Sequence, residues 1–180
     1  MQAWKKKKGL MRAVKYSCVF EPMEREVLGN LSAVVSEALI NRAQSVKKDP
    51  LAEMTGIPGG HQEAPEDPGM ARLLPDFEME GDEEYEGDNS LLRSFHEHDI
   101  TKAKIQNLQV INSALGPDGD VAVSASEEEA QAWLSGLNDI RIYLAADDIR
   151  GGEAAEEDRE NLIQWLAYNQ ESLLEAMMKA

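Results

Sequence analysis

Four stretches of the chain space their apolar residues with the period of an α-helix, in which positions three and four apart share one face. The first begins at Pro22, because a proline at the first helical position loses no hydrogen bond. Its apolar stripe comprises Met23, Val27, Leu31, Val34, Val35, Ala38 and Leu39. The second covers residues 90–115, with a break predicted near Asp99; the third covers 126–149, and the fourth starts at about Arg159. We therefore predict a mainly α fold, a single-domain helical bundle of about four long helices.

Alternating polarity predicts a short β element at the N-terminus. Residues 10–20 are rich in β-branched and aromatic side chains that alternate with polar ones, which predicts a strand, or one arm of a hairpin with residues 3–6. Residues 46–89 hold most of the prolines and an acidic run. We interpret them as a long, solvated connection inside a single domain of residues 1–180, interrupted by one helical turn over 67–74.

Charge separates a basic arm, within residues 1–20, from the rest of the chain. Residues 1–15 hold six Lys or Arg side chains and no acid. The other 165 residues share the remaining 12 basic and all 34 acidic side chains, a net charge of −22 against −16 for the whole chain. A body this acidic repels a phosphate backbone, so we expect a protein partner with a basic surface and no direct DNA binding. We interpret the arm as an edge strand whose lysines oppose aggregation; contact with nucleic acid is the alternative.

Several function classes find no support in the sequence. No apolar run is long enough to cross a membrane, and the N-terminal segment lacks the apolar core of a secretory signal, so we expect a cytoplasmic protein. No nucleophile elbow, glycine-rich phosphate loop or Cys-x-x-Cys motif occurs, and His96 and His98 stand two apart, which directs them away from each other on a helix. We therefore predict no enzymatic activity, no cofactor and no metal. Cys18, the single cysteine, is interpreted as a core residue; a reactive thiol is the alternative.

Polar residues that fall on apolar helix stripes form the candidate site. With about 100° per residue, Arg141 and Lys104 lie inside the stripes of their helices, whereas Asp139 points to the far side. Polar residues at the edges of the last helix's stripe complete a candidate cluster of Lys104, Arg141, Asn169, Gln170 and Glu171. Because burying a lone cation is costly, we expect the two cations to meet these residues between packed helices. The alternatives are cations that extend to the rim, or a pocket that binds a small molecule or catalyses a reaction.

Four groups of residues along the chain stand out together. They are the N-terminal Trp-Lys arm followed by Phe20-Glu21-Pro22, Glu24 and Glu26-Val27-Leu28; Leu73-Leu74-Pro75-Asp76; Ala132-Trp133-Leu134 with Leu137-Asn138-Asp139-Ile140-Arg141; and Trp165-Leu166 with Gln170-Glu171-Ser172-Leu173. In this order and spacing they resemble the AosR family, the actinomycete oxidative stress regulators, formerly a domain family of unknown function. The resemblance covers nearly the whole chain.

The resemblance implies a cytoplasmic, non-enzymatic regulator. Family members are proposed to act with a stress sigma factor and RNA polymerase, raising transcription of genes for thiol and cysteine supply. Redox sensing in the family is linked to a cysteine pair near the N-terminus, whereas this chain has Cys18 alone. An intramolecular disulfide switch is therefore excluded, and an intermolecular bridge or a sulfenic acid remains. A homodimer or larger homo-oligomer that uses a helix face as its interface is a third, purely structural, interpretation.

Overall fold

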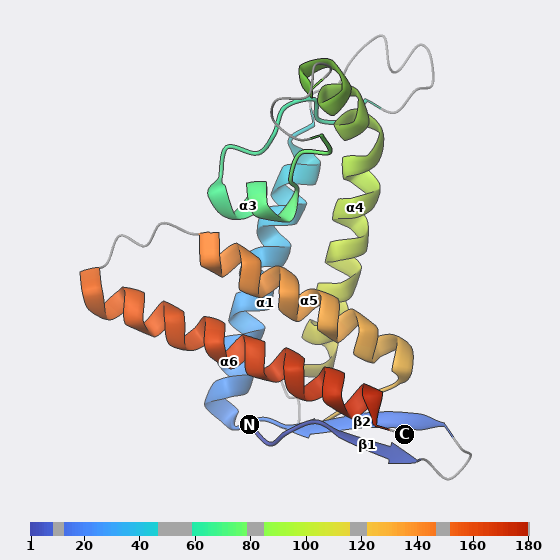
Figure 1. Cartoon of the computed structure of the whole chain (residues 1–180), viewed down its shortest axis with the longest axis vertical. Coiled ribbons are helices and arrows are strands. Elements are labelled where there is room, and N and C mark those ends of the chain that lie inside the picture. Colours follow the sequence, from blue (N-terminus) through green and yellow to red (C-terminus); the bar gives the residue numbers. More distant parts are fainter. Residues whose placement is uncertain (9–12, 47–58, 79–84, 116–121, 147–151, 180) are drawn as a thin grey trace.

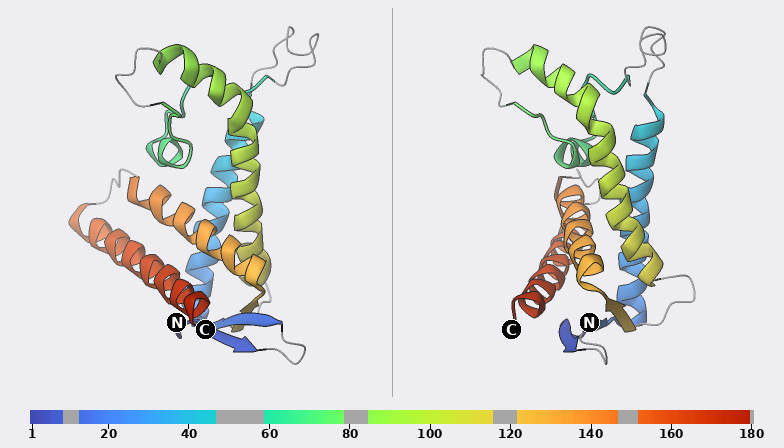
Figure 2. Two further views of the ribbon diagram at one scale, coloured as in Figure 1. Left: turned by 45° about the vertical axis from the view of Figure 1, so that its right-hand side comes forward. Right: turned by 90° about the vertical axis from the view of Figure 1, so that its right-hand side faces the viewer.

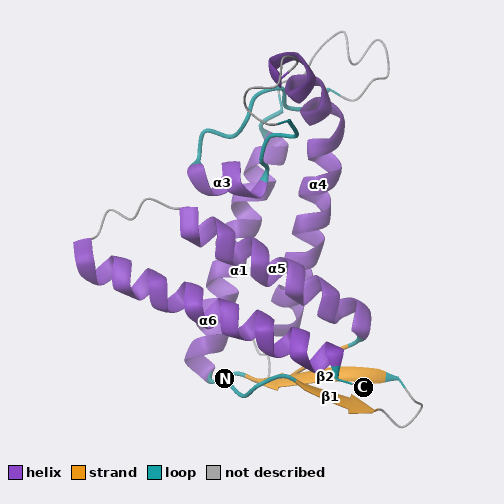
Figure 3. Ribbon diagram, in the orientation of Figure 1, coloured by secondary structure: helices purple, strands orange, loops and turns teal. Residues whose placement is uncertain are grey.

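The computed structural model describes residues 1–8, 13–46, 59–78, 85–115, 122–146 and 152–179. The strands are β1 (Lys5–Lys8), β2 (Val14–Val19) and β3 (Ala122–Ala125). The helices are α1 (Pro22–Gln44), α3 (Pro68–Leu73), α4 (Tyr85–Leu115), α5 (Glu127–Ala146) and α6 (Gly152–Met178). Helices make up most of the described chain, and the strands lie at one end (Figures 1 and 3). The predicted mainly α fold with an N-terminal β element is confirmed.

The four long helices form two antiparallel pairs that cross each other. α1 and α4 lie side by side along the long axis of the molecule, and the pair of α5 and α6 crosses them (Figures 1 and 2). α5 is the central helix, because it contacts α1, α3, α4 and α6. The sheet closes the end at which the N-terminus and the C-terminal end of α6 lie (Figure 1).

Local capping interactions fix where three of the helices begin. α1 starts with a capping box between Glu21 and Glu24, followed by the predicted proline. At α3 the Asp67 carboxylate accepts a hydrogen bond of 2.8 Å from a backbone N–H three residues further on. At α5 the Glu129 side chain accepts from the backbone N–H of Ser126 at 2.7 Å, and the serine hydroxyl accepts in return. These interactions satisfy N–H groups that a helix start leaves without partners.

The sheet contains a third strand that the sequence did not predict. Its order is β1-β2-β3, and both outer strands run antiparallel to β2, so the expected hairpin gains a partner from the other half of the chain. Ser17 of β2 lies opposite Ser124 of β3 on the outer face, while Tyr16, Cys18 and Val123 face the core. A four-residue strand is too short for alternation to stand out in the sequence, and β2 supplies its pairing.

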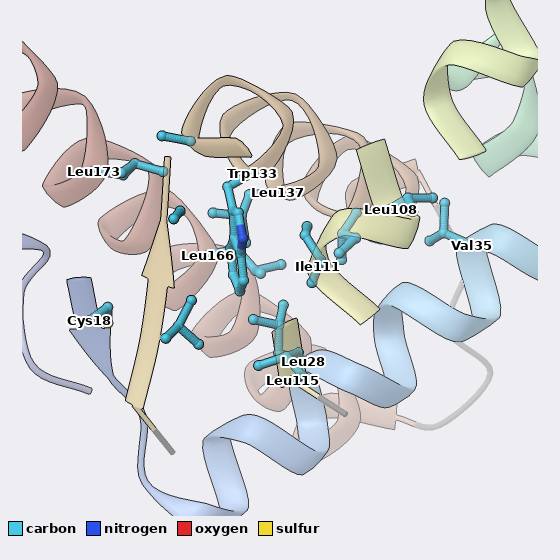
Figure 4. Packing of buried hydrophobic residues seen from close by; sticks show 14 of the residues in the cluster. Cys18, Leu28, Val35, Leu108, Ile111, Leu115, Trp133, Leu137, Leu166 and Leu173 are labelled. Atoms are coloured by element: carbon cyan, nitrogen blue, oxygen red, sulfur yellow. The ribbon is translucent and has the colours of Figure 1, made fainter. Parts of the chain in front are cut away.

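Trp133 lies at the centre of the hydrophobic core. Its fully buried side chain stands between β3 and Ile111 of α4 (Figure 4). Leu28 of α1, Leu137 of α5 and Leu166 of α6 are equally buried and belong to the same cluster. One core therefore joins both helix pairs and the sheet, so the position of each element depends on the others.

Two helix boundaries differ from the prediction. α4 begins at Tyr85, where Ser90 was expected, and runs unbroken through Asp99, which is exposed. α6 begins at Gly152, about two turns before Arg159. In α6 the first-turn residue Glu153 interacts favourably with the helix dipole, so an acidic segment that resembled a loop extends this helix instead.

The environments of two predicted segments also differ. On α1, Met23 and Val34 were placed on the buried stripe but are 76% and 53% exposed, because the buried face is formed by other positions of the same helix. The connection was predicted to be solvated, yet within residues 59–78 the α3 side chains of Met70 and Leu73 are buried against α5. The predicted helical turn is confirmed as α3. Residues 47–58 and 79–84 lie outside the described residues.

Candidate functional site

The structure does not bring the predicted polar cluster together. The Lys104 ammonium lies 2.7 Å from the Asp139 carboxylate, and the Arg141 guanidinium donates a 3.2 Å hydrogen bond to Asn138 on its own helix. Gln170 donates to the Leu134 carbonyl at 3.1 Å. The remaining two residues of the cluster, Asn169 and Glu171, are buried and exposed, respectively. The expected pairing of both cations with the polar residues of the last helix is therefore wrong.

Asp139 was placed on the far side of its helix and is instead almost fully buried. α5 has neighbours on several sides, and Gly136 marks a second buried face: a Cβ added there would lie 2.7 Å from the Ile111 side chain of α4. On this face Asp139 meets Lys104 from α4. Burial raises the pKa of Asp139, and the hydrogen bond and charge of Lys104 only partly oppose this effect.

Two polar residues of α6, Asn169 and Ser172, hold the N-terminal arm. The indole N–H of Trp4 donates to Asn169 Oδ1 at 2.7 Å, and the Trp4 backbone N–H donates to Ser172 Oγ at 2.8 Å. All three side chains are buried. A buried indole N–H needs an acceptor, and the amide supplies one. Asn169 and Ser172 therefore fasten residues about 170 positions apart, whereas Arg141 pairs with Asn138 on its own helix.

Four aromatic side chains from distant parts of the sequence meet beside this contact. The Trp4 and Trp133 rings lie 5.3 Å apart at 67°, an edge-to-face arrangement, and Phe20 stacks on Trp133 at 6.0 Å. Trp165 contacts Phe20 at 6.4 Å and donates its indole N–H to Glu24 at 3.1 Å. Each aromatic pair in such geometry contributes about 0.5–1.5 kcal/mol beyond its buried area. Three of the four motif groups in the sequence thus supply one packing unit.

The remaining motif group, Leu73-Leu74-Pro75-Asp76, is held by a buried arginine that the sequence did not predict. Arg93 of α4, 1% exposed, donates to the Leu74 carbonyl at 3.1 Å, to the Pro75 carbonyl at 3.3 Å and to the Asp76 carboxylate at 2.6 Å. A planar guanidinium with five donors suits such a set of acceptors. Asn89, one turn earlier, accepts from the next two backbone N–H groups of the same segment.

Glu97 connects this arginine to α1. Its carboxylate accepts from Arg93 at 2.8 Å and from Arg42 at 2.8 and 3.2 Å, and its side chain is buried. Burial by itself would raise the pKa of Glu97, but the hydrogen bonds and charges of the two arginines together lower it below its usual value. Arg42 also donates to the Glu63 carbonyl, so the network joins α1, the connection and α4.

A cleft of about 520 Å³ adjoins this network at the end of α1. It is lined by Arg42, Ser45, Glu63, Glu66 and the segment 59–62, mostly polar groups. The arginine is already paired with Glu97 and with a backbone carbonyl, so the cleft offers no unpaired cation from this side chain. In chemical terms the network fixes segments of the chain to one another, because Arg42, Arg93 and Glu97 pair with each other and with backbone carbonyls.

Cys18 occupies a core position, as the sequence predicted. Its side chain is 2% exposed, and the thiol lies 3.0 Å from the Gln2 carbonyl. Burial raises the pKa of Cys18 to about 12, so the nucleophilic thiolate is scarce.

Among the residues that the structure describes, no group of three or more His, Cys, Asp or Glu side chains is placed to hold a metal ion. None of the described helices is long and apolar enough to span a membrane.

The ion-pair network of Arg42, Arg93 and Glu97 is partly recognisable in the sequence. Arg93 and Glu97 are four residues apart, a spacing that pairs opposite charges on one helix face. The pair is overlooked because such pairs are common on exposed faces. Only the packing of Leu73–Asp76 over α4 shows that this one is buried.

The fold and the polar contacts define a class: a helical protein with a small sheet, in which buried polar side chains fasten distant segments of the same chain. A family described as "Domain of unknown function (DUF2017)" matches residues 1–177. The chain is 33% identical over 177 residues to the oxidative stress regulator AosR of Mycobacterium tuberculosis (strain ATCC 25618 / H37Rv), covering 87% of this chain and 79% of that protein. It is 31% identical over 182 residues to a putative oxidative stress regulator AosR of Mycobacterium leprae, covering 91% and 83%. The chain therefore belongs to this family, as the resemblance predicted, and no solved structure matches it.

Proposed function

We propose that this chain is a non-enzymatic regulator of the oxidative stress response that acts in the cytoplasm through contacts with a sigma factor and RNA polymerase. The observation that carries this proposal is the similarity over 87% of the chain to proteins named oxidative stress regulator AosR. The similarity spans both helix pairs and the sheet, so it concerns the whole fold and not one shared motif.

The charge of the chain fits a role in protein contacts. The net charge of −16 favours association with basic protein surfaces and opposes the binding of a phosphate backbone. Complementary charge mainly speeds encounter and selects partners, which suits a regulator that binds reversibly. The lysines of β1 are the local exception to this acidic character.

The alternative of a small-molecule or enzymatic site in the predicted polar cluster loses its basis. That function required Lys104, Arg141 and Gln170 to converge on one cavity, and each of these side chains has a different partner. The proposal therefore places the function on the surface of the protein and assigns the buried polar groups to its stability.

The test is direct binding to purified transcription machinery from the same organism. The immobilised chain is exposed to core RNA polymerase, to isolated stress sigma factor and to the holoenzyme, at low and high salt. We expect binding to at least one of them, weakened by salt because the contact is charged. An unrelated protein of similar size and net charge is the control. The proposal is abandoned if the chain binds no better than this control, and if neither sigma factor nor polymerase accompanies it from oxidant-treated cells.

A further inference from the structure

The two edges of the sheet differ in chemistry. β1 consists of four lysines, and lysines on an edge strand prevent pairing with another chain. β3 has the sequence Ala-Val-Ser-Ala, with neither charge nor proline. Because β2 is the central strand, the side of β3 that faces away from β2 is the second edge of the sheet. One edge is therefore protected against strand addition by its side chains, and the other is not.

Within the described residues, the outer side of β3 has no backbone partner. Apart from the pairing with β2, no backbone hydrogen bond between described residues involves Ala122–Ala125. Alternate residues of an edge strand direct both their N–H and their C=O away from the sheet, so these groups, which have no backbone partner among the described residues, can pair with another strand. β3 lies next to the C-terminal end of α4 and the start of α5 (Figure 2).

A groove of about 440 Å³ adjoins the second half of β3, at Ser124 and Ala125. Its α4 wall includes Gln106, Gln109 and Ser113, and its β3 side is formed by Ser124 and Ala125. The α4 side chains are spaced three and four residues apart and so share one face of the helix. They are mostly neutral amides and hydroxyls, which can both donate and accept hydrogen bonds. An added strand would pair with the β3 backbone and direct alternate side chains onto this wall.

The negative charge beside the groove indicates which kind of strand would bind there. Glu127, Glu128 and Glu129 directly follow β3 and are exposed. A second copy of the chain would bring the same glutamates and a further net charge of −16 to the edge, which opposes self-association. A segment with lysine or arginine would instead be attracted to it. We propose that the free edge of β3 binds an extended, basic segment of another protein by antiparallel strand addition, with its basic residues at the end next to these glutamates.

The test uses a synthetic peptide as the probe, Lys-Lys-Val-Thr-Val-Thr-Val labelled at its C-terminus with fluorescein. In the antiparallel orientation its two lysines lie next to the glutamates. Fluorescence anisotropy measures its affinity, and hydrogen exchange measures the protection of the Ala122–Ala125 amides. We expect binding that protects these amides. A peptide with glutamates in place of the lysines, and one with proline in place of the central valine, should bind at least about tenfold more weakly.

The matched variants carry the same charge change at different places. Ser124→Lys puts a lysine on the β3 edge, and Ser135→Lys puts one on the exposed face of α5, away from the groove. Ser124→Lys should weaken binding at least about tenfold, and Ser135→Lys should change it by less than about twofold. Ser113→Lys, on the α4 wall of the groove, replaces the first variant if Ser124→Lys lowers the urea midpoint of unfolding.

Several results would overturn the proposal. Equal loss of affinity in Ser124→Lys and Ser135→Lys would show that net charge alone attracts the peptide. Equal binding of the proline peptide, or no binding of the lysine peptide, would exclude strand addition of a basic segment. Sedimentation velocity would reveal a dimer; if the wild type forms one and Ser124→Lys dissociates it, the edge is occupied by a second copy. The proposal does not rest on the regulatory role, and these measurements need neither polymerase nor sigma factor.

Discussion

Replacing Glu97 with glutamine should loosen the attachment of the Leu73–Asp76 segment and of α1 to α4. The carboxylate accepts three hydrogen bonds, two from Arg42 at 2.8 and 3.2 Å and one from Arg93 at 2.8 Å. Glutamine keeps the shape of the side chain but has one acceptor oxygen, and its amide N–H groups would face guanidinium donors. The variant therefore removes a buried charge and places amide N–H groups against guanidinium N–H groups, without creating a cavity.

The magnitude follows from which contacts survive. Removing one partner of a buried ion pair costs about 3–5 kcal/mol when the other partner is left without compensation. Here Arg93 keeps Asp76 at 2.6 Å and the Leu74 carbonyl at 3.1 Å, and Arg42 keeps the Glu63 carbonyl. We therefore expect the lower end of the range, a loss of about 3 kcal/mol in the free energy of unfolding. For a chain of this size each kcal/mol lowers the melting temperature by about 2–4 °C.

The pH dependence gives the prediction a second, independent readout. The pKa of Glu97 is lowered from its ordinary value of 4.5, so its contribution to stability is present above that value and is lost as the pH falls through the folded-state pKa. The pKa of Asp139 is raised, so its contribution to stability changes with pH in the opposite direction. Asp139 is present in both proteins, so this contribution cancels when wild type and variant are compared. The difference between wild type and Glu97→Gln should therefore be largest at neutral pH and should shrink below 4.5.

Urea unfolding followed by tryptophan fluorescence, at a series of pH values, measures both effects. Glu160→Gln on the exposed surface of α6 is the matched control, and it should change the free energy of unfolding by less than about 0.5 kcal/mol. A loss below about 1 kcal/mol for Glu97→Gln, or a difference that does not change with pH, would refute the structural role assigned to the carboxylate.

Other parts of the structure can be tested in the same way. Trp4→Phe should lower the free energy of unfolding by about 1–3 kcal/mol, because buried Asn169 Oδ1 loses its 2.7 Å donor; an unchanged urea midpoint would contradict this. Cys18 should resist a thiol reagent until the protein is unfolded in guanidinium, because burial raises its pKa to about 12; equally fast labelling of the native protein would show an accessible thiolate. Gly29→Ala should raise the melting temperature, since nothing lies within 4 Å of the added Cβ and alanine is favoured in a helix by about 1 kcal/mol. Gly60→Ala should lower it, because the Cβ would lie 2.2 Å from a backbone carbonyl oxygen of α4; calorimetry showing the same direction for both would count against the packing.

Local patterns in the sequence are sufficient to locate the helices and the hairpin, but not the starts of α4 and α6. Apolar periodicity depends on neighbouring residues, and so do the capping signals at Glu21, Asp67 and Ser126, which is why α1, α3 and α5 begin close to the predicted positions. β3 is different, because a four-residue strand exists only through its pairing with β2, more than 100 residues away in the sequence. No local pattern contains that partner.

The candidate site could not be predicted because a helical wheel describes one helix without its neighbours. It gives the angle between Arg141 and Asp139, but it does not show that α5 is surrounded by four other helices and therefore has more than one buried face. Asp139 thus turned out to be the partner of Lys104, while Arg141 stayed at the edge with a partner on its own helix. Arg93 was missed for the same reason: its burial depends on a segment that crosses over α4 from outside the helix.

The motifs that identify the family have a structural explanation, and this limits what they can say about function. Trp4, Phe20, Trp133 and Trp165 form one aromatic cluster, and the Leu-Leu-Pro-Asp segment is held by Arg93. Trp4, Phe20, Trp133, Leu73 and Leu74 are too buried to contact a partner without unfolding, so these residues serve the fold and not a binding surface. Trp165 is half-buried, and Pro75 and Asp76 are exposed. The regulatory contact that we propose therefore requires exposed groups. On the described surface, the β3 edge with its three glutamates combines unpaired backbone groups, a groove and a charge opposite to that of a basic partner, which makes it the first place to look for that contact.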